Sequence, residues 1–427
     1  MGTNLASVDL GAGRTAKAVS AGTGHTCALL DDATVKCWGY NKYGQLGLGD
    51  ITYRGDNANE MGTNLASVDL GAGRTAVAVS AGSYHTCALL DDATVKCWGY
   101  NGYGNLGLGD KFNRGDDVDE MGTNLASVDL GAGRTAVAIS AGLFHSCALL
   151  DDATVKCWGQ NSDGRLGLGD TDHRGDDADE MGTNLASVDL GAGRTAKAVS
   201  AGIYHTCALL DDATLKCWGR NARGQLGLGD ISSRGDDADE MGTNLASVDL
   251  GTGRTAKAVS AGYDFTCALL DDATVKCWGF NVDGQLGLGD TARRGDDANE
   301  MGTNLTWVDL GAGRTAVNVS AGWSHACALL DDATVKCWGH NTDGELGLGD
   351  MSSRGDDANG PCLSHTHSLS LFLSLVFSRS FSLSLSPSLS LPPAPHAPPP
   401  RLSCRPHVTS PLLLLSACRD GDEPRLG

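Results

Sequence analysis

Short apolar runs alternate with polar turns along this chain, and the pattern recurs every 60 residues. In the first unit, Thr15–Ala21 alternates small apolar residues with polar ones, which is typical of a half-buried strand. The runs His25–Leu30 and Thr34–Trp38 are rich in β-forming residues, and the polar residues 31–33 between them indicate a hairpin. A fourth short run, Ser67–Leu70, follows a glycine-rich loop and an acidic loop. Each unit is therefore predicted to form four short strands, and no segment has the period of a helix.

The repeated block starts at Ala21 and ends at Gly39 in the first unit, and it returns five more times. Its period is clearest in the first cysteine of each copy, at Cys27, Cys87, Cys147, Cys207, Cys267 and Cys327. A fixed period of this length indicates stacked units, none of which can bury its apolar face alone. Six units account for residues 1–360. We therefore predict that this region is one all-β, six-bladed β-propeller of four-stranded antiparallel blades.

The ends of the repeat region indicate how the ring closes. Ser7–Leu10 matches the fourth strand of a unit whose first three strands are missing, whereas the last unit supplies three strands within Thr315–Trp338 and no fourth. If the two remnants complete one blade, no sheet edge stays open to aggregation. We expect a closed ring in which Ser7–Leu10 is the outer strand of the last blade.

Residues 361–427 differ in character from the repeats. Serine and leucine alternate from Ser368 onward, and proline accumulates around Pro392–Pro400. Such low-complexity sequence does not specify a packed core. We expect a disordered tail.

Three motifs of the repeat, His25-Thr-Cys-Ala-Leu, Val35-Lys-Cys-Trp-Gly and Gly44-Gln-Leu-Gly-Leu-Gly-Asp, resemble the repeats of the regulator of chromosome condensation family. The same blade type is found in the bacterial β-lactamase inhibitor propeller. The resemblance covers all six units and implies a propeller, although such relatives usually have seven blades. It says little about function, because this superfamily serves unrelated partners.

The turn at residues 31–33 departs from the family pattern, which usually has glycine after Asp-Asp. This chain has Ala33, and alanine again at the five equivalent positions. If that residue is left-handed, alanine costs about 1 kcal/mol per unit. A four-residue type I turn would avoid the cost, so two turn geometries stay open.

Charge limits the partners that this chain can have. Its 427 residues carry a formal net charge of −20 and show no cluster of Lys and Arg of the kind that tracks phosphates. We therefore expect no direct nucleic-acid contact, and expect another protein as the partner, with a basic surface suiting the charge. No run approaches about 18 apolar residues, so no membrane span is expected.

The six units differ mainly at three places, all in predicted loops: the pair after Ala-Gly, the residues around the Asn after Trp-Gly, and the three residues before Arg-Gly-Asp. Constant strands with variable loops are how a rigid scaffold diversifies a binding surface. Random drift is the alternative, but drift would not favour aromatic residues in a chain with only 5% of them. Aromatic residues and arginine dominate interface energetics. The predicted contact residues are Tyr40, Tyr43, Tyr100, Tyr103, Phe144, Tyr204, Arg223, Tyr263 and Trp323.

Each unit also carries a pair of cysteines: Cys27 and Cys37, Cys87 and Cys97, Cys147 and Cys157, Cys207 and Cys217, Cys267 and Cys277, and Cys327 and Cys337. A three-residue turn at 31–33 would place the first pair opposite one another, and alternation puts His25 on the same face. Free buried thiols, a cross-strand disulfide and a His-Cys-Cys zinc site all fit this pattern. Phe265 replaces the histidine in the fifth unit, which disfavours metal.

Between the remaining two states we favour free thiols, because a short apolar hairpin could hold without a bridge that closes so small a loop. The absence of a secretory signal at the start of the sequence supports this expectation. The corresponding expectation is a cytoplasmic protein. Disulfides would instead imply a secreted one.

The recurring histidine is a poor catalytic candidate. It is spread around a ring, whereas an active site gathers a base, a nucleophile and an oxyanion donor at one place. A hydrogen bond that ties a blade to a loop is its expected role. We predict a non-enzymatic protein-interaction scaffold with no cofactor and no metal. The alternative, implied by the resemblance, is guanine-nucleotide exchange on a small GTPase, which would need an inserted wedge that no unit carries.

Overall fold

The computed structural model describes residues 5–357, and their regular structure is almost entirely β. Helical structure within those residues is limited to two 3-10 turns, Gly62–Asn64 and Gly302–Asn304. The strands are β1 (Ala16–Ala21), β2 (His25–Leu30), β3 (Val35–Gly39), β4 (Ala76–Ala81), β5 (His85–Leu90), β6 (Val95–Gly99), β7 (Ala136–Ala141), β8 (His145–Leu150), β9 (Val155–Gly159), β10 (Ala196–Ala201), β11 (His205–Leu210), β12 (Leu215–Gly219), β13 (Ala256–Ala261), β14 (Phe265–Leu270), β15 (Val275–Gly279), β16 (Ala316–Ala321), β17 (His325–Leu330) and β18 (Val335–Gly339).

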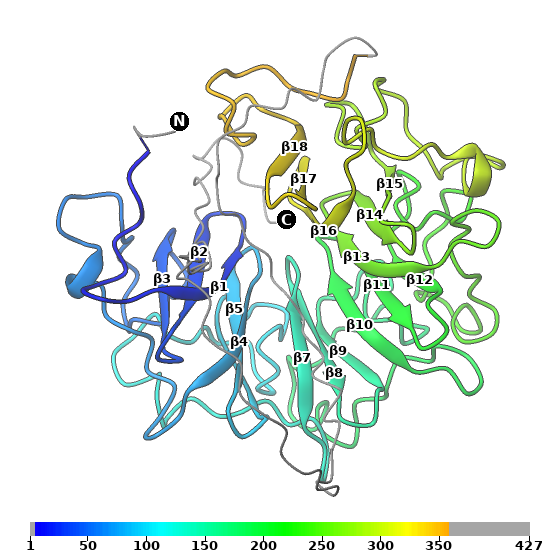
Figure 1. The fold of residues 1–427 in the computed structure, drawn as a ribbon. Helices are drawn as coiled ribbons and strands as arrows, with labels where there is room; N and C mark the ends of the chain where they lie inside the picture. The colour runs from blue at the N-terminus through cyan, green and yellow to red at the C-terminus, as the bar shows by residue number, and fades with distance from the viewer. Residues whose placement is uncertain (1–4, 358–427) are drawn as a thin grey trace, which may run out of the picture.

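Each unit folds into one three-stranded antiparallel sheet whose strands follow chain order, as in β1–β2–β3. The six sheets follow one another along an arc, from blue β1–β3 through β7–β9 to gold β16–β18 (Figure 1). The first strands of neighbouring sheets, such as β1 and β4, contact one another and therefore form the inner side of the arc. The all-β architecture of repeated blades is thus confirmed. The tail predicted to be disordered, 361–427, lies outside the described residues.

The hairpin between β2 and β3 has the three-residue loop that places the cysteines opposite one another. Leu30 N donates to Thr34 O at 2.8 Å, and Ala33 N donates to Leu30 O at 3.0 Å. Ala33 is left-handed, with φ of 65°, and its five equivalents have φ between 63° and 65°. Of the two open turn geometries, this sequence therefore adopts the costlier one. Asp32 supports the turn, because its Oδ1 accepts hydrogen bonds from the backbone and the hydroxyl of Thr34.

The fourth run of each unit approaches the sheet but does not form a strand. Val68 N donates to Val35 O of β3 at 2.8 Å, so Ser67–Leu70 lies along the outer edge of the preceding blade. The carbonyl of Leu70 instead accepts a hydrogen bond from the Lys96 ammonium at 3.1 Å. Because this carbonyl is occupied by a side chain, the ladder stops. The blades were predicted to have four strands. In the structure each sheet has three strands, and the fourth run is an outer segment beside it.

The hydrophobic cores lie between blades. One of them combines Cys27, Leu29 and Val35 of the first blade with Ala88 and Leu90 of the second. The tryptophan of the second blade joins this core and is fully buried, as are its equivalents in the four later blades, namely Trp98, Trp158, Trp218, Trp278 and Trp338. Every blade thus needs a neighbour to bury its apolar face, which agrees with the reasoning from the period.

The expected pairing of Ser7–Leu10 with the last blade is wrong. Val8 and Leu10 pack against Val19 and Leu30 of the first blade, as the equivalent run does in later units. In the described part of the chain no hydrogen bond joins this segment to β18. The first and last blades therefore do not share a sheet, because within residues 5–357 Val8 lacks the bond to a preceding blade that Val68 N makes to Val35 O.

Candidate partner-binding face

The structure brings all three variable positions of the repeat to one face. Tyr40 N donates to Gly24 O at 2.8 Å, so the loop after β3 lies against the loop between β1 and β2. The Tyr40 ring lies 5.0 Å from the ring of Tyr53, which belongs to the third variable position, and 6.4 Å from that of Tyr84 in the next unit. Loops that are far apart in sequence thus form one surface across neighbouring blades.

The first three blades carry a continuous chain of ring contacts on this face. Tyr43 and Tyr100 are 5.1 Å apart in edge-to-face geometry, and Tyr100 continues to Tyr103 at 6.2 Å. Such contacts stabilise aromatic side chains beyond their burial. We call this set the aromatic ridge; it consists of Tyr40, Tyr43, Tyr53, Tyr84, Tyr100, Tyr103, Phe144 and His173.

Arginines gather on the same face of the fourth and fifth blades. Arg220 lies over the ring of Tyr204 at 4.9 Å, and Arg223 and Arg293 lie 5.5 and 5.7 Å from the ring of Phe280. We call Arg220, Arg223 and Arg293 the arginine cluster. Among residues 5–357 these are the arginines without an ion pair, whereas Arg114, for example, pairs with Asp110 at 2.6 Å. Their aromatic neighbours hold them by cation–π attraction and leave their charge available.

Asp264 lies within the arginine cluster and modifies its charge. Its side chain is only 4% exposed, and its Oδ1 accepts a hydrogen bond from Gln225 Nε2 at 2.7 Å. Burial raises the pKa of Asp264, while Arg220 and Arg223 oppose that shift. Asp163 also acts on Asp264 but forms an ion pair with Arg165, so the three guanidinium groups without an ion pair among residues 5–357 leave a positive patch on an otherwise acidic chain.

Of the predicted contact residues, most lie partly exposed on this face, and Phe144 does not. Phe144 is 6% exposed and packs beneath Tyr84, Tyr100 and Tyr103, so it supports the ridge from below. Trp323 is the most exposed, at 40%, and stacks on Tyr263 at 4.5 Å. Tyr53, Tyr84, Arg220, Arg293 and Phe280 belong to the same face and were missed, although their occurrence at variable positions was a usable signal.

Two tyrosines of the face, Tyr100 and Tyr263, stay neutral at physiological pH. Burial, with Tyr103 and Tyr43 nearby, raises the pKa of Tyr100 to about 12. Burial and the neighbouring Tyr204 raise the pKa of Tyr263 to about 12. These rings therefore act as hydrogen-bonding and stacking groups and do not supply negative charge.

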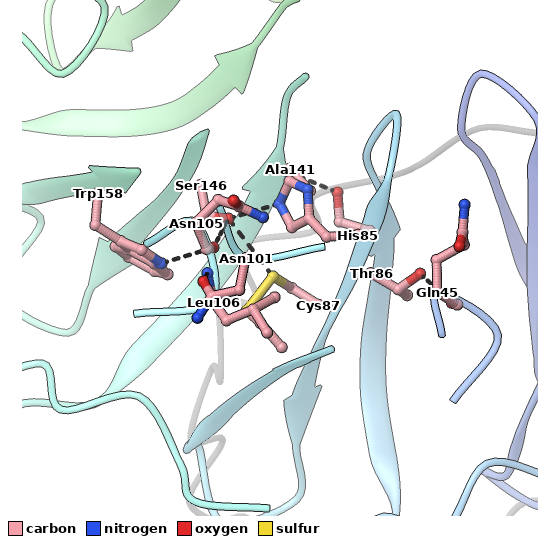
Figure 2. The surroundings of a disulfide bond; sticks show 12 residues. Gln45, His85, Thr86, Cys87, Asn101, Asn105, Leu106, Ala141, Ser146 and Trp158 are labelled. Carbon is pink, nitrogen blue, oxygen red and sulfur yellow. Dashed lines mark hydrogen bonds between the residues drawn. A yellow bond between two sulfur atoms is a disulfide. The ribbon is translucent and has the colours of Figure 1, made fainter. Parts of the chain in front are cut away.

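The recurring histidine lies between blades and has a structural role, as expected, although its partner is on the next blade and not in a loop. His85 Nε2 and Ser146 Oγ are 2.8 Å apart, and Ser146 Oγ donates to Asn105 O, which also accepts from Trp158 Nε1 (Figure 2). Because the hydroxyl hydrogen goes to the carbonyl, His85 Nε2 is the donor in the first bond. Burial lowers the pKa of His85 to about 3, so the ring stays neutral.

The paired cysteines form disulfides, so the preference for free thiols is wrong. Cys27 pairs directly with Cys37 in the β2–β3 register, with a Cα–Cα distance of 4.1 Å, and the bond recurs in all six blades. The three-residue turn is the reason, because it places the two sulfur atoms on one face at directly opposed positions. His25 does not join them, since its Nε2 bonds to Thr86.

A succession of similar three-stranded blades, joined by cores between the blades, defines a β-propeller-type repeat protein. Residues 17–371 match the RCC1-like domain, and the chain belongs to that family. The ultraviolet-B receptor UVR8 of Arabidopsis thaliana is 28% identical over 381 residues, which cover 79% of this chain and 79% of the receptor. The human E3 ubiquitin-protein ligase HERC2 is 27% identical over 322 residues, but the match covers only 6% of that ligase and 75% of this chain.

Solved structures show the same fold. Human WBSCR16 has a TM-score of 0.60 at 20% identity, with 81% of each chain covered. Yeast RCC1 (Prp20), in its complex with Kap60, has a TM-score of 0.58 at 22% identity, covering 79% of this chain and 73% of Prp20. Fold and family together support a regulatory or protein-interaction role. Within residues 5–357, no helix has the length and apolar character that crossing a membrane requires.

Proposed function

We propose that this chain is a non-enzymatic protein-interaction scaffold whose partner contacts the aromatic ridge and the arginine cluster. The observation that carries the proposal is the convergence of all three variable positions on one face. Tyr40 alone contacts the ring of Tyr53 from the third position and that of Tyr84 from the next unit. Partly exposed, rigidly packed aromatic rings and arginines are the residues that dominate protein interfaces.

The opposite face supports this assignment by contrast. It is built from the β2–β3 turns, whose aspartates are paired in every unit with an arginine of the same unit, as Arg74 is with Asp91 and Asp92. Exposed pairs of this kind satisfy their own charge and contribute little to binding. This face repeats the same residues six times, whereas the aromatic ridge differs from blade to blade, as recognition of one specific partner requires.

The arginine cluster favours carboxylate groups on the contacting surface of the partner. Arg220, Arg223 and Arg293 lie over aromatic rings and form no ion pair within residues 5–357. Acidic side chains of a partner could therefore form ion pairs with them. The net charge of −20 acts at longer range and still favours a partner with a basic region elsewhere. Contact and long-range steering can thus use different parts of one partner.

Affinity capture with the full chain tests the proposal. Proteins retained by the unaltered chain are identified by mass spectrometry and then recaptured by two variants. Arg220→Glu/Arg223→Glu reverses charge on the proposed face, and Arg74→Glu/Arg134→Glu makes the same charge change on the opposite face. We expect at least a tenfold loss of retention for the first variant and little loss for the second. Equal retention by both variants would show that the partner binds elsewhere.

Guanine-nucleotide exchange on a small GTPase is the second candidate. It is favoured by the likeness to Saccharomyces cerevisiae Prp20p, whose structure was described together with its binding to Gsp1p and histones. The six near-identical units argue for plain binding, since none carries an insertion. A nucleotide-release assay over a panel of small GTPases separates the two functions. Release accelerated by the unaltered chain would favour exchange.

A further inference from the structure

The sixth unit departs from the others within a stretch that is otherwise nearly constant. Residues 301–320 differ from residues 61–80 of the second unit at three positions, which carry Thr306, Trp307 and Asn318. Two of these changes each complete an Asn-x-Ser/Thr sequence, the acceptor signal for N-linked glycosylation. The other five units have an asparagine at the position of Asn304 but alanine two residues later, so only the sixth unit can accept a glycan there.

The first of the two acceptor sequences, Asn304-Leu305-Thr306, lies on an anchored part of the surface. Asn304 ends the second 3-10 turn, and both Asn304 and Thr306 are exposed. Leu305 between them is buried, and Val308 N donates to Val275 O of β15 at 2.8 Å. The segment is thus fixed along the outer edge of a blade while its asparagine is open to solvent.

The amide of Asn304 can take a sugar without losing the contact that orients it. Its Nδ2 donates one hydrogen bond, to the carbonyl of Asn299 at 2.8 Å. A primary amide carries two hydrogens on this nitrogen, and glycosylation replaces one of them. The other hydrogen can keep the bond to Asn299, so the folded segment accommodates the modification.

The second acceptor sequence, Asn318-Val319-Ser320, is less suitable. Asn318 lies in the inner strand β16, opposite Leu329 of β17, and its side chain is only partly exposed. Strand β16 also contacts β13 of the preceding blade. A bulky glycan at this position would therefore crowd the inner strands, so Asn304 is the better acceptor.

We propose that Asn304 carries an N-linked oligosaccharide. The transfer joins Nδ2 of Asn304 to the anomeric carbon of the sugar and breaks the bond of that carbon to the diphosphate of a lipid-linked oligosaccharide donor. The displaced proton leaves with the diphosphate. This transfer takes place in the lumen of the secretory pathway, where disulfides also form, and this chain has one disulfide in each of its six blades. The proposal does not depend on the partner-binding face.

Peptide mapping of the protein isolated from the cells that naturally make it tests the proposal. Peptide N-glycosidase F, used in heavy-oxygen water, converts a glycosylated asparagine into a labelled aspartate. We expect at least tenfold more label at Asn304 than at its counterparts, which share the Asn-Leu sequence and control for spontaneous deamidation: Asn64, Asn124, Asn184 and Asn244. An unlabelled Asn304, or label at Asn318 alone, would overturn the proposal.

Two variants of the full chain, secreted from insect cells behind a cleavable leader, provide matched controls. Thr306→Ala restores the sequence of the other units and should remove the glycan from Asn304. Ala66→Thr copies the acceptor sequence to the second unit, where Asn64 is exposed and its Nδ2 donates to Asn59 O at 2.8 Å, and should add one glycan. Position 66 is exposed, as Thr306 is, so neither change should alter Tm noticeably. An undiminished glycan in Thr306→Ala, or no gain in Ala66→Thr, would contradict the assignment from this segment's geometry.

Discussion

Phe265 of β14 and Ala326 of β17 occupy, at the fifth junction, the two positions that a histidine–hydroxyl hydrogen bond joins at the other four. Both side chains are 0% exposed and belong to the same core. The equivalent bonds elsewhere span 2.7 to 3.0 Å, as between His205 and Thr266 or His145 and Thr206. Because both partners are replaced together, no buried imidazole or hydroxyl is left without its partner.

A double-mutant cycle at this pair should show strong coupling. Phe265→His alone buries an imidazole donor opposite a methyl group and should destabilise the fold by about 1–3 kcal/mol. Adding Ala326→Thr supplies the hydroxyl, which can donate to the carbonyl of Gln285 as in the other blades, and should recover at least about 1 kcal/mol. Urea unfolding of both single variants and the double variant measures the coupling. Strictly additive effects would contradict the interpretation of this pair.

The buried histidines predict loss of stability in mild acid. Burial lowers the pKa of His25 to about 4 and that of His205 to about 3, whereas the pKa in the unfolded chain is about 6.5. Between these values the unfolded state binds more protons, so the stabilisation is complete above about pH 6.5 and declines as pH falls toward 4. We expect about 2.5 kcal/mol of lost stability per histidine by pH 4.5.

The paired change His205→Phe/Thr266→Ala provides the control for this prediction, because it copies the natural junction of Phe265 and Ala326. Urea midpoints at pH 7.0 and 4.5 should differ less in this variant than in the unaltered chain, by about the contribution of one histidine. An identical pH dependence in both proteins would mean that other groups govern acid unfolding.

The left-handed alanines predict easy stabilisation. Ala93, with φ of 63°, should gain about 1 kcal/mol when replaced by glycine, because glycine has no Cβ to strain in this region. Ala93→Gly and Ala153→Gly together should add nearly independently, since they lie in different blades. Replacing Ala88, buried in regular strand β5, with glycine is the control and should destabilise. A lower Tm for Ala93→Gly would show that its Cβ contributes more by packing than it costs in strain.

The cysteine pairs predict a simple result by intact mass. Twelve of the 15 cysteines are paired in six disulfides, so alkylation under denaturing conditions without reductant should modify at most three. After reduction all 15 should react. Disulfides in every blade would favour an oxidising compartment over the cytoplasmic location expected from the sequence. Twelve or more modifications without reductant would restore the free-thiol interpretation.

Local features of this fold could be derived from the sequence because the same strand runs, turn residues and cysteine spacing recur in all six units. The strand runs, the hairpin at residues 31–33 and the opposition of Cys27 and Cys37 follow from alternation and turn length, which are properties of neighbouring residues. The need for stacking followed from the period, since one unit is too small to bury Trp38 or its equivalents alone. The choice of variable loops as the candidate face came from comparing units within one chain.

Tertiary structure decided whatever depends on contacts between units. The sequence could not show that Ser7–Leu10 packs on its own blade, because closure depends on the rotation between blades, which many inter-blade contacts set together. It could not place Phe144 beneath Tyr100, since burial of a loop residue depends on rings supplied by the neighbouring unit. Nor could it reveal that Arg220, Arg223 and Arg293 meet around Asp264. Alternation and spacing report on neighbours along the chain, whereas a binding face is made by residues one blade apart in space and 60 residues apart in sequence.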